Sequence, residues 1–335
     1  MRIPSFACEV RYLNKAISRS SLKALLQKTV DHDRRAMARL MSVTENDPYA
    51  RIKILAALYK HTGRAYIVGI TGPPGAGKST LIAELAKHYR QKGYSIGIVA
   101  VDPTSQLTGG ALLGDRIRMG DLASDTKVFI RSMATRGRVG GIAHATEDVV
   151  RILDAASTDY IFVETVGAGQ SDVDIKAIAQ TIVVVTAPGL GDEIQALKAG
   201  IMEIGDIFVV NKSDREDPDS AVQEIRSMLT LSEPTEGWRP RVLKTSALSG
   251  EGMSTLVETI TQHAHHLKQT HKQETDSLKA RREIVDAAKR YFEDITLREL
   301  ISTPEFAELA SLVERRKIDP YTAARRVLQS TRTRK

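Results

Sequence analysis

One glycine-rich segment constrains the fold of this chain more than any other feature. Residues 72–79 read Gly-Pro-Pro-Gly-Ala-Gly-Lys-Ser, which fits the phosphate-binding pattern G-x-x-x-x-G-K-[ST]. An apolar run at 65–70 precedes the segment, and a run with helical spacing at 81–90 follows it. A strand, a glycine-rich turn and a helix in this order turn backbone N–H groups and the positive end of a helix dipole toward one anion. The segment therefore predicts an α/β domain that binds a nucleotide, rather than a glycine turn that binds nothing.

Individual residues of this segment have separate predicted tasks. Lys78 is expected to reach the β- and γ-phosphates, and the Ser79 hydroxyl is expected to hold Mg²⁺. The glycines allow the backbone to approach the phosphates closely. The residues predicted to contact the nucleotide here are Gly72, Pro73, Pro74, Gly75, Ala76, Gly77, Lys78, Ser79 and Thr80.

A second motif indicates which base the site reads. Residues 211–214, Asn-Lys-Ser-Asp, follow an apolar run at 206–210 and have the form N-K-x-D. A carboxylate at Asp214 accepts hydrogen bonds from guanine N1–H and the 2-amino group, whereas adenine lacks this pair of donors. Alone the motif is compatible with a polar turn, but Ser-Ala-Leu at 246–248 follows another strand-like run at 241–245. The combination predicts GTP rather than ATP. The predicted base-contacting residues are Asn211, Lys212, Asp214, Ser246, Ala247 and Leu248.

Two acidic residues stand where buried strands end. Asp102 directly follows the apolar run at 95–101, and Glu164 directly follows the run at 159–163. Gly167 lies three residues after Glu164. Ligands of open α/β sheets lie at the carboxyl ends of strands, so Asp102 is a candidate for the Mg²⁺ shell. Glu164 can hold a metal-bound or attacking water, and Gly167 lets the backbone approach the γ-phosphate. The alternative for both acids is a helix cap after a strand, which suits aspartate better than glutamate.

Composition restricts the remaining possibilities. The chain has 335 residues, 42% of them hydrophobic, one cysteine and a net charge of +7. No apolar stretch reaches eighteen residues, and the first residues lack the apolar length of a signal peptide. The lone Cys8 offers neither a disulfide framework nor a C-x-x-C motif. A cytoplasmic protein is expected, and nucleic-acid binding is disfavoured because no aromatic residues interleave the basic ones.

The chain divides into three predicted parts. Residues 1–64 carry helical periodicity and are predicted as a helical extension. From 65 to 265 strands alternate with helices, which predicts a mainly parallel sheet covered on both faces. Residues 266–335 are strand-poor and are predicted as a helical segment. Within the middle part, glycine and basic residues gather at 108–119 and 131–141, as in loops that switch conformation with the nucleotide.

The motifs together resemble the MeaB/ArgK/MMAA group of G proteins, which are chaperones of cobalamin-dependent acyl-CoA mutases. The resemblance covers nearly the whole chain from about residue 15 and implies a P-loop GTPase fold and a homodimer formed through the C-terminal helices. It also implies that the chain gates cobalamin loading or protection of a methylmalonyl-CoA mutase type enzyme, which itself binds the cobalamin. The segments that carry it are residues 72–79, 102–105, 109–119, 164–171 and 191–200.

The resemblance also implies roles for individual residues. Ser79, Asp102 and Asp115 would surround Mg²⁺, with Glu164 reaching it through water. Arg118 would lie in the first switch region. The residues expected to take part in hydrolysis are Lys78, Asp115, Arg118 and Glu164, and those expected to signal to the mutase, in a third switch at about 187–198, are Gln195 and Lys198.

Three other functions are compatible with parts of the sequence. A nickel-insertion GTPase would need a metal-binding loop, and the candidate is the histidine group His263, His265, His266 and His271, which is more typical of a solvated surface. A kinase linked to basic amino-acid transport would need an acceptor site, and none is visible in the sequence. A pure interaction protein would not need the set of metal-binding acids.

Overall fold

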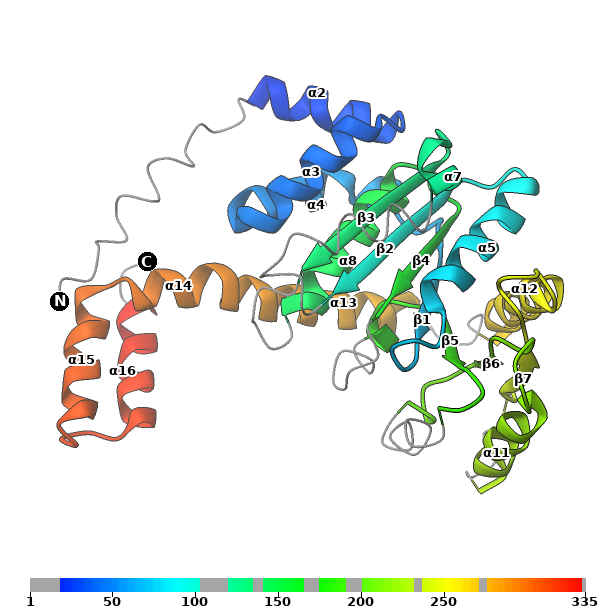
Figure 1. Ribbon diagram of the computed structural model, residues 1–335. Helices are drawn as coiled ribbons and strands as arrows, with labels where there is room; N and C mark the ends of the chain where they lie inside the picture. Colours follow the sequence, from blue (N-terminus) through cyan, green and yellow to red (C-terminus); the bar gives the residue numbers. More distant parts are fainter. Residues whose placement is uncertain are drawn as a thin grey trace. The chain divides into compact units, whose positions relative to one another are not determined.

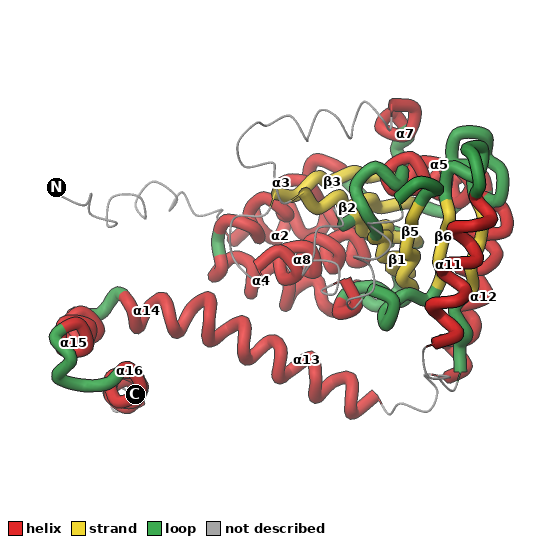
Figure 2. Tube along the Cα trace, turned by 60° about the horizontal axis from the view of Figure 1, so that its bottom comes forward, coloured by secondary structure: helices red, strands yellow, loops and turns green. Residues whose placement is uncertain are grey.

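The computed structural model describes residues 19–102, 120–134, 141–165, 175–190, 201–231, 237–270 and 276–332. The chain forms two compact units, Met1–Gln269 and Thr270–Lys335. The first contains the sheet, and the second is helical (Figures 1 and 2). Among the described residues, no helix is long and apolar enough to cross a membrane.

A seven-stranded sheet forms the centre of the first unit, and every recorded strand pair in it is parallel. The strand order is β3-β2-β4-β1-β5-β6-β7. Chain order reverses on either side of β1, and in such sheets the ligand crevice lies at the carboxyl ends of the strands at this point. The strands are β1 (Tyr66–Thr71), β2 (Ile96–Asp102), β3 (Val128–Ala134), β4 (Tyr160–Glu164), β5 (Thr181–Thr186), β6 (Ile207–Val210) and β7 (Arg241–Lys244).

Alternating residues of the strands supply two separate cores, one on each face of the sheet. In β6, Ile207 and Val209 join one hydrophobic cluster, whereas Phe208 and Val210 join the other. Because successive side chains of a strand point to opposite faces, a strand buried on both sides must be apolar throughout. Helices α5 (Lys78–Gln91) and α12 (Met253–Thr270) contribute to the first cluster. Helices α8 (Gly141–Ala155) and α11 (Pro218–Leu231) contribute to the second.

The predicted N-terminal helices are present and pack into the second of these cores. They are α2 (Arg19–Val30), α3 (Arg34–Asn46) and α4 (Pro48–Leu58), followed by the 3₁₀ turn η1 (Tyr59–His61). Asp33 and Asp47 cap α3 and α4 through their side chains. After η1, the backbone N–H groups of Gly63, Arg64 and Ala65 donate hydrogen bonds to the Asp154 carboxylate on α8. This contact fixes the chain where it enters β1.

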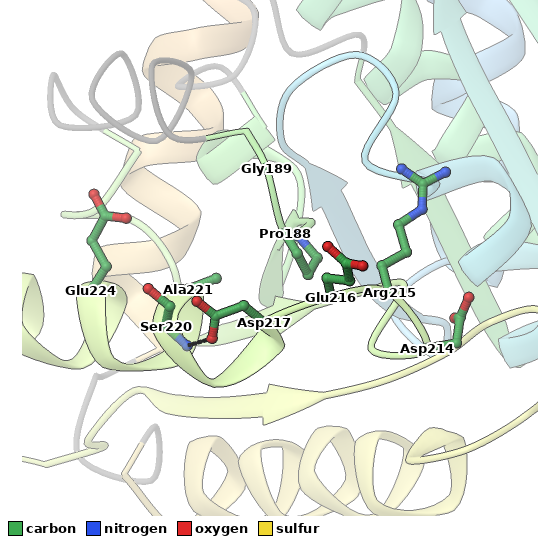
Figure 3. A pocket seen from close by; sticks show the side chains of 9 residues that line it. All are labelled: Pro188, Gly189, Asp214, Arg215, Glu216, Asp217, Ser220, Ala221 and Glu224. Atoms are coloured by element: carbon green, nitrogen blue, oxygen red, sulfur yellow. Dashed lines mark hydrogen bonds between the residues drawn. The ribbon is translucent and has the colours of Figure 1, made fainter.

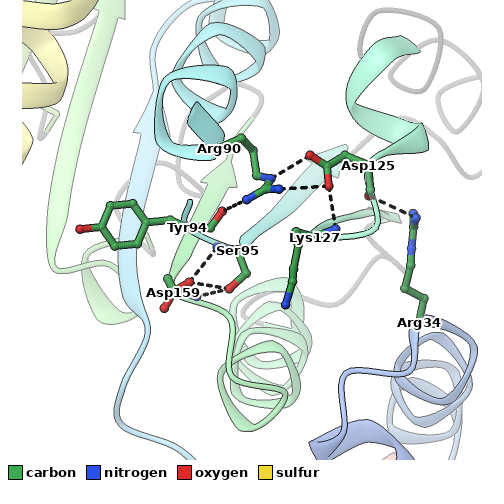
Figure 4. Close-up of polar contacts among 7 residues, drawn as sticks. All are labelled: Arg34, Arg90, Tyr94, Ser95, Asp125, Lys127 and Asp159. Atoms are coloured by element: carbon green, nitrogen blue, oxygen red, sulfur yellow. Dashed lines mark hydrogen bonds and ion pairs between the residues drawn. The ribbon is translucent and has the colours of Figure 1, made fainter. Parts of the chain in front are cut away.

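A polar cluster ties the end of the phosphate-loop helix to the outer part of the sheet (Figure 4). Arg90 of α5 contacts both carboxylate oxygens of Asp125, at 2.8 and 3.4 Å. Asp125 follows the short helix α7 (Gly120–Ser124). Arg34 of α3 donates to the backbone carbonyl of Asp125 (3.4 Å), so three elements meet here. The Arg90 guanidinium is the main reason that the pKa of Asp125 lies below its ordinary value.

One part of the segment predicted as a switch loop belongs to the sheet instead. Residues 131–134 lie in β3, and α8 already begins at Gly141, while 135–140 lie outside the described residues. Arg131 pairs with Glu45 of α3 at 2.8 Å, so its charge joins β3 to the N-terminal helices. The buried Val128 and Phe129 supply the apolar contacts that make this stretch a strand.

The second unit consists of helices, as predicted. Helix α13 (Asp276–Tyr291) continues through a π-helical turn, η4 (Phe292–Thr296), into α14 (Leu297–Ile301). Helices α15 (Pro304–Glu314) and α16 (Pro320–Arg332) follow. The buried residues of its small core are Leu300, Leu309, Ala323 and Val327. Large apolar side chains that remain exposed on α13, η4 and α14 are Ile284, Val285, Tyr291, Phe292, Leu297 and Ile301.

Candidate nucleotide-binding site

The phosphate loop lies between β1 and α5, as the sequence predicts. Gly72 has φ 136°, and a Cβ atom there would lie only 1.9 Å from the Val185 carbonyl oxygen. Gly75 and Gly77 have φ values of 79° and 90°, which side-chain-bearing residues rarely adopt. The glycines are therefore required by the backbone path itself. Helix α5 starts at Lys78, so its positive dipole end faces the loop.

Lys78 lies inside this loop with its ammonium group held by the backbone. Its side chain is buried, and Nζ donates to the carbonyl oxygens of Gly72 (2.7 Å) and Pro73 (3.0 Å). A buried ammonium group needs such acceptors because its desolvation is otherwise unfavourable. The lysine charge is thus placed next to the backbone that is predicted to surround the phosphates.

Asn211 joins the N-K-x-D motif to two other loops. Its side-chain amide donates to the Ala76 carbonyl oxygen of the phosphate loop (3.0 Å). Its side-chain oxygen accepts from Thr245 Oγ1 (3.2 Å) and from the Ala247 backbone N–H (3.1 Å). Asn211 is almost completely buried, so these bonds form away from water. The sequence predicted that Asn211 contacts the nucleotide but did not identify Thr245, which stands directly before the Ser-Ala-Leu motif.

Lys212 and Asp214 occupy the exposed side of the same motif. Lys212 has φ 58° and donates from Nζ to the Gly75 carbonyl oxygen (2.5 Å), so its stem extends toward the phosphate loop. Ser246 Oγ donates to Asp214 Oδ1 at 2.6 Å. This hydrogen bond is the main reason that the pKa of Asp214 lies below its ordinary value, so the carboxylate stays ionised as an acceptor. Leu248, 88% exposed, follows Ala247 in the neighbouring loop.

Ser79 and Glu164 meet at the carboxyl edge of the sheet. Ser79 Oγ donates to Glu164 Oε1 at 2.7 Å, and the Glu164 side chain is largely buried. Asp102 ends β2, the strand next to β4. Hydroxyl and carboxylate oxygens are the donors that Mg²⁺ prefers, so this pair fits the predicted cation. Among the side chains that the structure describes, no group of three or more His, Cys, Asp or Glu could hold a metal ion.

Several predicted residues cannot be placed around this centre. Thr80 lies exposed in the first turn of α5. The predicted residues outside the described part of the chain are Asp115, Arg118, Gly167, Gln195 and Lys198. Their roles remain predictions.

A pocket of about 790 Å³ opens beside the N-K-x-D motif (Figure 3). Its walls are formed by the turn after β5, by residues 214–217, and by the start of α11. Four carboxylates and one guanidinium line it, which makes it acidic. The lining residues are Pro188, Gly189, Asp214, Arg215, Glu216, Asp217, Ser220, Ala221 and Glu224.

The histidine group differs from the predicted solvated surface. His263 is only 2% exposed, and its Nδ1 lies 2.7 Å from Thr181 Oγ1. His265 is exposed and His266 is half-buried, whereas His271 lies outside the described residues. The prediction was therefore wrong for His263, because this face of α12 packs against the sheet.

Known proteins are similar in sequence to most of this chain. A putative GTPase of Pyrococcus horikoshii is 48% identical over 309 residues, which are 91% of this chain and 96% of the relative. The mitochondrial methylmalonic aciduria type A homolog of Mus musculus is 37% identical over 204 residues, which are 60% of this chain and 49% of that protein. A crystal structure described as LAO/AO transport system kinase has a TM-score of 0.69 at 22% identity, covering 95% of this chain and all of that one. At this identity the likeness supports the fold alone.

The family match agrees with the site geometry. Residues 37–301 match the family described as methylmalonyl-CoA mutase-associated GTPase MeaB, so the matched region contains every placed element of the nucleotide site. The chain is a guanine-nucleotide-binding GTPase, and it belongs to the MeaB family.

Proposed function

We propose that this GTPase gates the loading or protection of cobalamin in an acyl-CoA mutase of the methylmalonyl-CoA mutase type. The description of its family supports the mutase as partner. The chain contains no D-x-H-x-x-G cobalamin-binding motif, so the cobalamin would be bound by the partner. In this proposal the nucleotide state of the chain determines whether the cofactor passes to the mutase.

The observation that carries the proposal is the linkage of three loops through Asn211. One side chain joins the phosphate loop at Ala76 to the loop at Thr245 and Ala247. The base-reading Asp214 is held by Ser246 of that same loop. A change at the phosphates therefore has a short, continuous route to the base-reading side of the site.

Hydrolysis is assigned to groups on the other side of the phosphate loop. When bound, Mg²⁺ would neutralise charge on the phosphates, and Ser79, Asp102, Asp115 and Glu164 are the residues that would hold it directly or through water. Lys78 would pair with the β- and γ-phosphate oxygens. Glu164 would orient water, and Arg118 would act from the first switch region. Turnover by the chain alone is expected to be slow and to be accelerated by the partner.

The partner's signal is assigned to residues 187–198, and in particular to Gln195 and Lys198. The described beginning of this segment supports the assignment. Pro188 and Gly189 form a wall of the same pocket that Asp214 lines, so the segment starts next to the base-reading motif. A partner that moves this segment would act on the nucleotide site directly.

We also assign a dimer contact to the helical segment 266–335, attached to a GTPase domain at 65–265 and a helical extension at 1–64. Apolar side chains along α13 support this assignment, since Ile284 is 68% exposed and Val285 is 51% exposed. Such surfaces in soluble proteins usually mark contacts with other chains. A cytoplasmic location would suit a chain with a single cysteine.

The test is GTP turnover with and without a cobalamin-dependent mutase from the same organism. We expect the mutase to accelerate the wild-type chain, and Lys198→Ala to lose most of this acceleration while keeping its basal rate, because only the coupling is removed. Lys60→Ala changes an exposed lysine that is distant from Lys198 in the sequence; it is the control and should behave as wild type. If wild type shows neither acceleration nor a nucleotide-dependent complex with any such mutase, the chaperone proposal fails and a transport-linked kinase becomes the better account.

A further inference from the structure

The connection from β4 to β5 has to cross β1, because β1 lies between these two strands in the sheet (Figure 1). This crossover, residues 165–180, is described at its two ends. At the first end, the Thr165 backbone N–H donates to the Ile70 carbonyl oxygen (3.0 Å). At the second end, the Gln180 N–H donates to the Ile67 carbonyl oxygen (2.9 Å), and the Gln180 side chain accepts from the Ile67 N–H (2.5 Å). Both ends of the crossover are therefore bonded to β1, the strand that leads into the phosphate loop.

Between these bonds the crossover packs directly on a glycine of β1. The 3₁₀ turn η2 (Ile175–Ala177) begins with Ile175, which is buried in the same core as α8 and α11. A Cβ atom at Gly69 would lie 2.6 Å from Ile175 Cδ1, 2.7 Å from Ile175 Cγ1 and 3.0 Å from Ala179 Cβ. Gly69 is not among the glycines with positive φ, so the backbone conformation does not require glycine there. What requires it is the close approach of the crossover.

The missing side chain at Gly69 thus determines how near the crossover lies to β1. Carbon atoms in ordinary contact are about 3.5–4.0 Å apart, so an added Cβ would displace the crossover by about 1 Å. Ile175 is only 1% exposed, and its side chain cannot turn out into solvent to avoid the contact. Close-packed cores transmit such a displacement instead of absorbing it.

This packing contact lies next to the groups assigned to hydrolysis. In the register of β1 with β4, Ile70 is opposite Glu164, and Gly69 precedes Ile70 by one residue. Gly69 also precedes Gly72, the first glycine of the phosphate loop, by three residues, which is about 10 Å along a strand. The crossover itself begins directly after Glu164. Its contact with Gly69 is therefore close to the nucleotide site without being part of it.

We propose that Ile175 on Gly69 is a positioning contact for GTP hydrolysis, which fixes the place of the residues that follow Glu164 relative to the phosphate loop. The inference rests on the assignment of Glu164 and Gly167 to hydrolysis under the proposed function and is independent of the mutase. Ile175 touches no nucleotide and acts through the crossover. A displacement of about 1 Å at a reacting centre lowers turnover by up to about 100-fold. GDP has no γ-phosphate, so its affinity should not depend on this contact.

The first test compares two glycines of the sheet in the full-length chain. Gly69→Ala should lower the single-turnover rate of GTP hydrolysis by about tenfold and change the GDP dissociation constant by less than about twofold. Gly97→Ala is the matched control, since a Cβ atom at Gly97 of β2 would lie 2.9 Å from Leu153 Cδ1 of α8 and crowd the same core away from the crossover. It should lower the thermal midpoint and hydrolyse GTP as wild type does. A wild-type rate in Gly69→Ala would overturn the proposal.

A double variant separates positioning from stability. Ile175→Ala alone removes the atoms that rest on Gly69 and should slow hydrolysis by about threefold or more. In Gly69→Ala/Ile175→Ala the new methyl group occupies the space of those atoms, so the rate should return to within about threefold of wild type. The truncated isoleucine still leaves the double variant with a lower thermal midpoint than wild type. A double variant as slow as Gly69→Ala, or slower, would contradict the positioning role.

The remaining outcomes are covered by two further variants. If Gly69→Ala does not fold, Ile175→Ala is compared with Ile152→Ala, which truncates a fully buried isoleucine of α8 in the same core. Only Ile175→Ala should slow hydrolysis, and equal rates in these two variants would overturn the inference. Glu164→Gln tests the assignment on which the inference rests. A wild-type rate in Glu164→Gln removes that assignment, whereas a slow Glu164→Gln beside a fast Gly69→Ala removes the positioning contact alone.

Discussion

Polar residues have different roles at the two ends of the parallel strands, which are called here the amino-terminal and carboxyl-terminal edges of the sheet. Strand β6 starts directly after Asp206 and ends directly before Asn211. At the amino-terminal edge, polar side chains contact one another and are buried. At the carboxyl-terminal edge, Lys78 and Asn211 bond to the backbone of loops, and Asp214 remains exposed.

We therefore expect the polar groups at the amino-terminal edge to stabilise the fold, and those at the carboxyl-terminal edge to bind a ligand. A polar chain that is satisfied internally has no remaining capacity for a substrate. The carboxyl-terminal edge instead combines glycine backbone at positive φ, a helix amino terminus and an exposed carboxylate. Changes at this edge should therefore alter nucleotide binding or turnover, while changes at the other edge should alter stability.

The largest effect is expected from removing the lysine charge of the phosphate loop. Lys78→Ala should weaken GTP binding by at least about 100-fold, because a charge-assisted contact with phosphate is lost in a water-poor site. Titration with a fluorescent GTP analogue measures this. Lys87→Ala, which removes an exposed lysine of the same helix paired with Glu84, should bind as wild type does. Equal losses in both variants would mean that the helix, and not the site, is disturbed.

Asp214→Asn should change the preferred base. We expect GDP binding to weaken by roughly 30-fold and xanthosine diphosphate binding to improve, because the amide now offers a donor where the carboxylate offered an acceptor. Calorimetry with both nucleotides gives the two affinities. Asp217→Asn, at a neighbouring exposed acid that caps α11, serves as the control. An unchanged preference in Asp214→Asn would remove this residue from the base contact.

The two ends of β4 allow the comparison to be tested within one strand. Glu164→Gln should slow GTP turnover by about tenfold or more and leave GDP affinity nearly intact, since its role is expressed through the metal and its water. Asp159, at the other end, accepts the backbone N–H and hydroxyl of Ser95, both at 2.7 Å. Asp159→Asn should lower the unfolding free energy by about 1 kcal/mol without slowing turnover. Wild-type turnover in Glu164→Gln would contradict the division between the edges.

The smallest effect is expected from the residue that holds Asp214 in place. Ser246→Ala removes the hydroxyl that donates a hydrogen bond to Asp214. It should weaken GDP binding by about 3- to 10-fold without changing the preferred base. Ser254→Ala, at an exposed serine in the first turn of α12, is the control. If Ser246→Ala also relaxed base discrimination, Asp214 would depend on its position more strongly than the geometry indicates.

The sequence predicted the parts of this molecule that depend on local pattern. The apolar runs at 65–70 and 206–210 placed β1 and β6 correctly, and the phosphate loop and N-K-x-D motif lie at the predicted strand ends. The local pattern does not predict which residues distant in the sequence come into contact. His263 meets Thr181 across 82 residues of sequence, whereas Ser79 and Glu164 were expected near one another only from the family resemblance. Periodicity indicates which face of a helix is apolar, but the polar residue that this face encounters depends on the packed fold.

The most direct test of the account is a calorimetric comparison of GDP and ADP binding to the wild-type chain in the presence of Mg²⁺. The account predicts that GDP binds at least about 100-fold more tightly, because adenine would leave the exposed Asp214 carboxylate without donors. Equal affinities for the two nucleotides would contradict the central claim that the carboxyl-terminal edge of this sheet is a guanine-reading site.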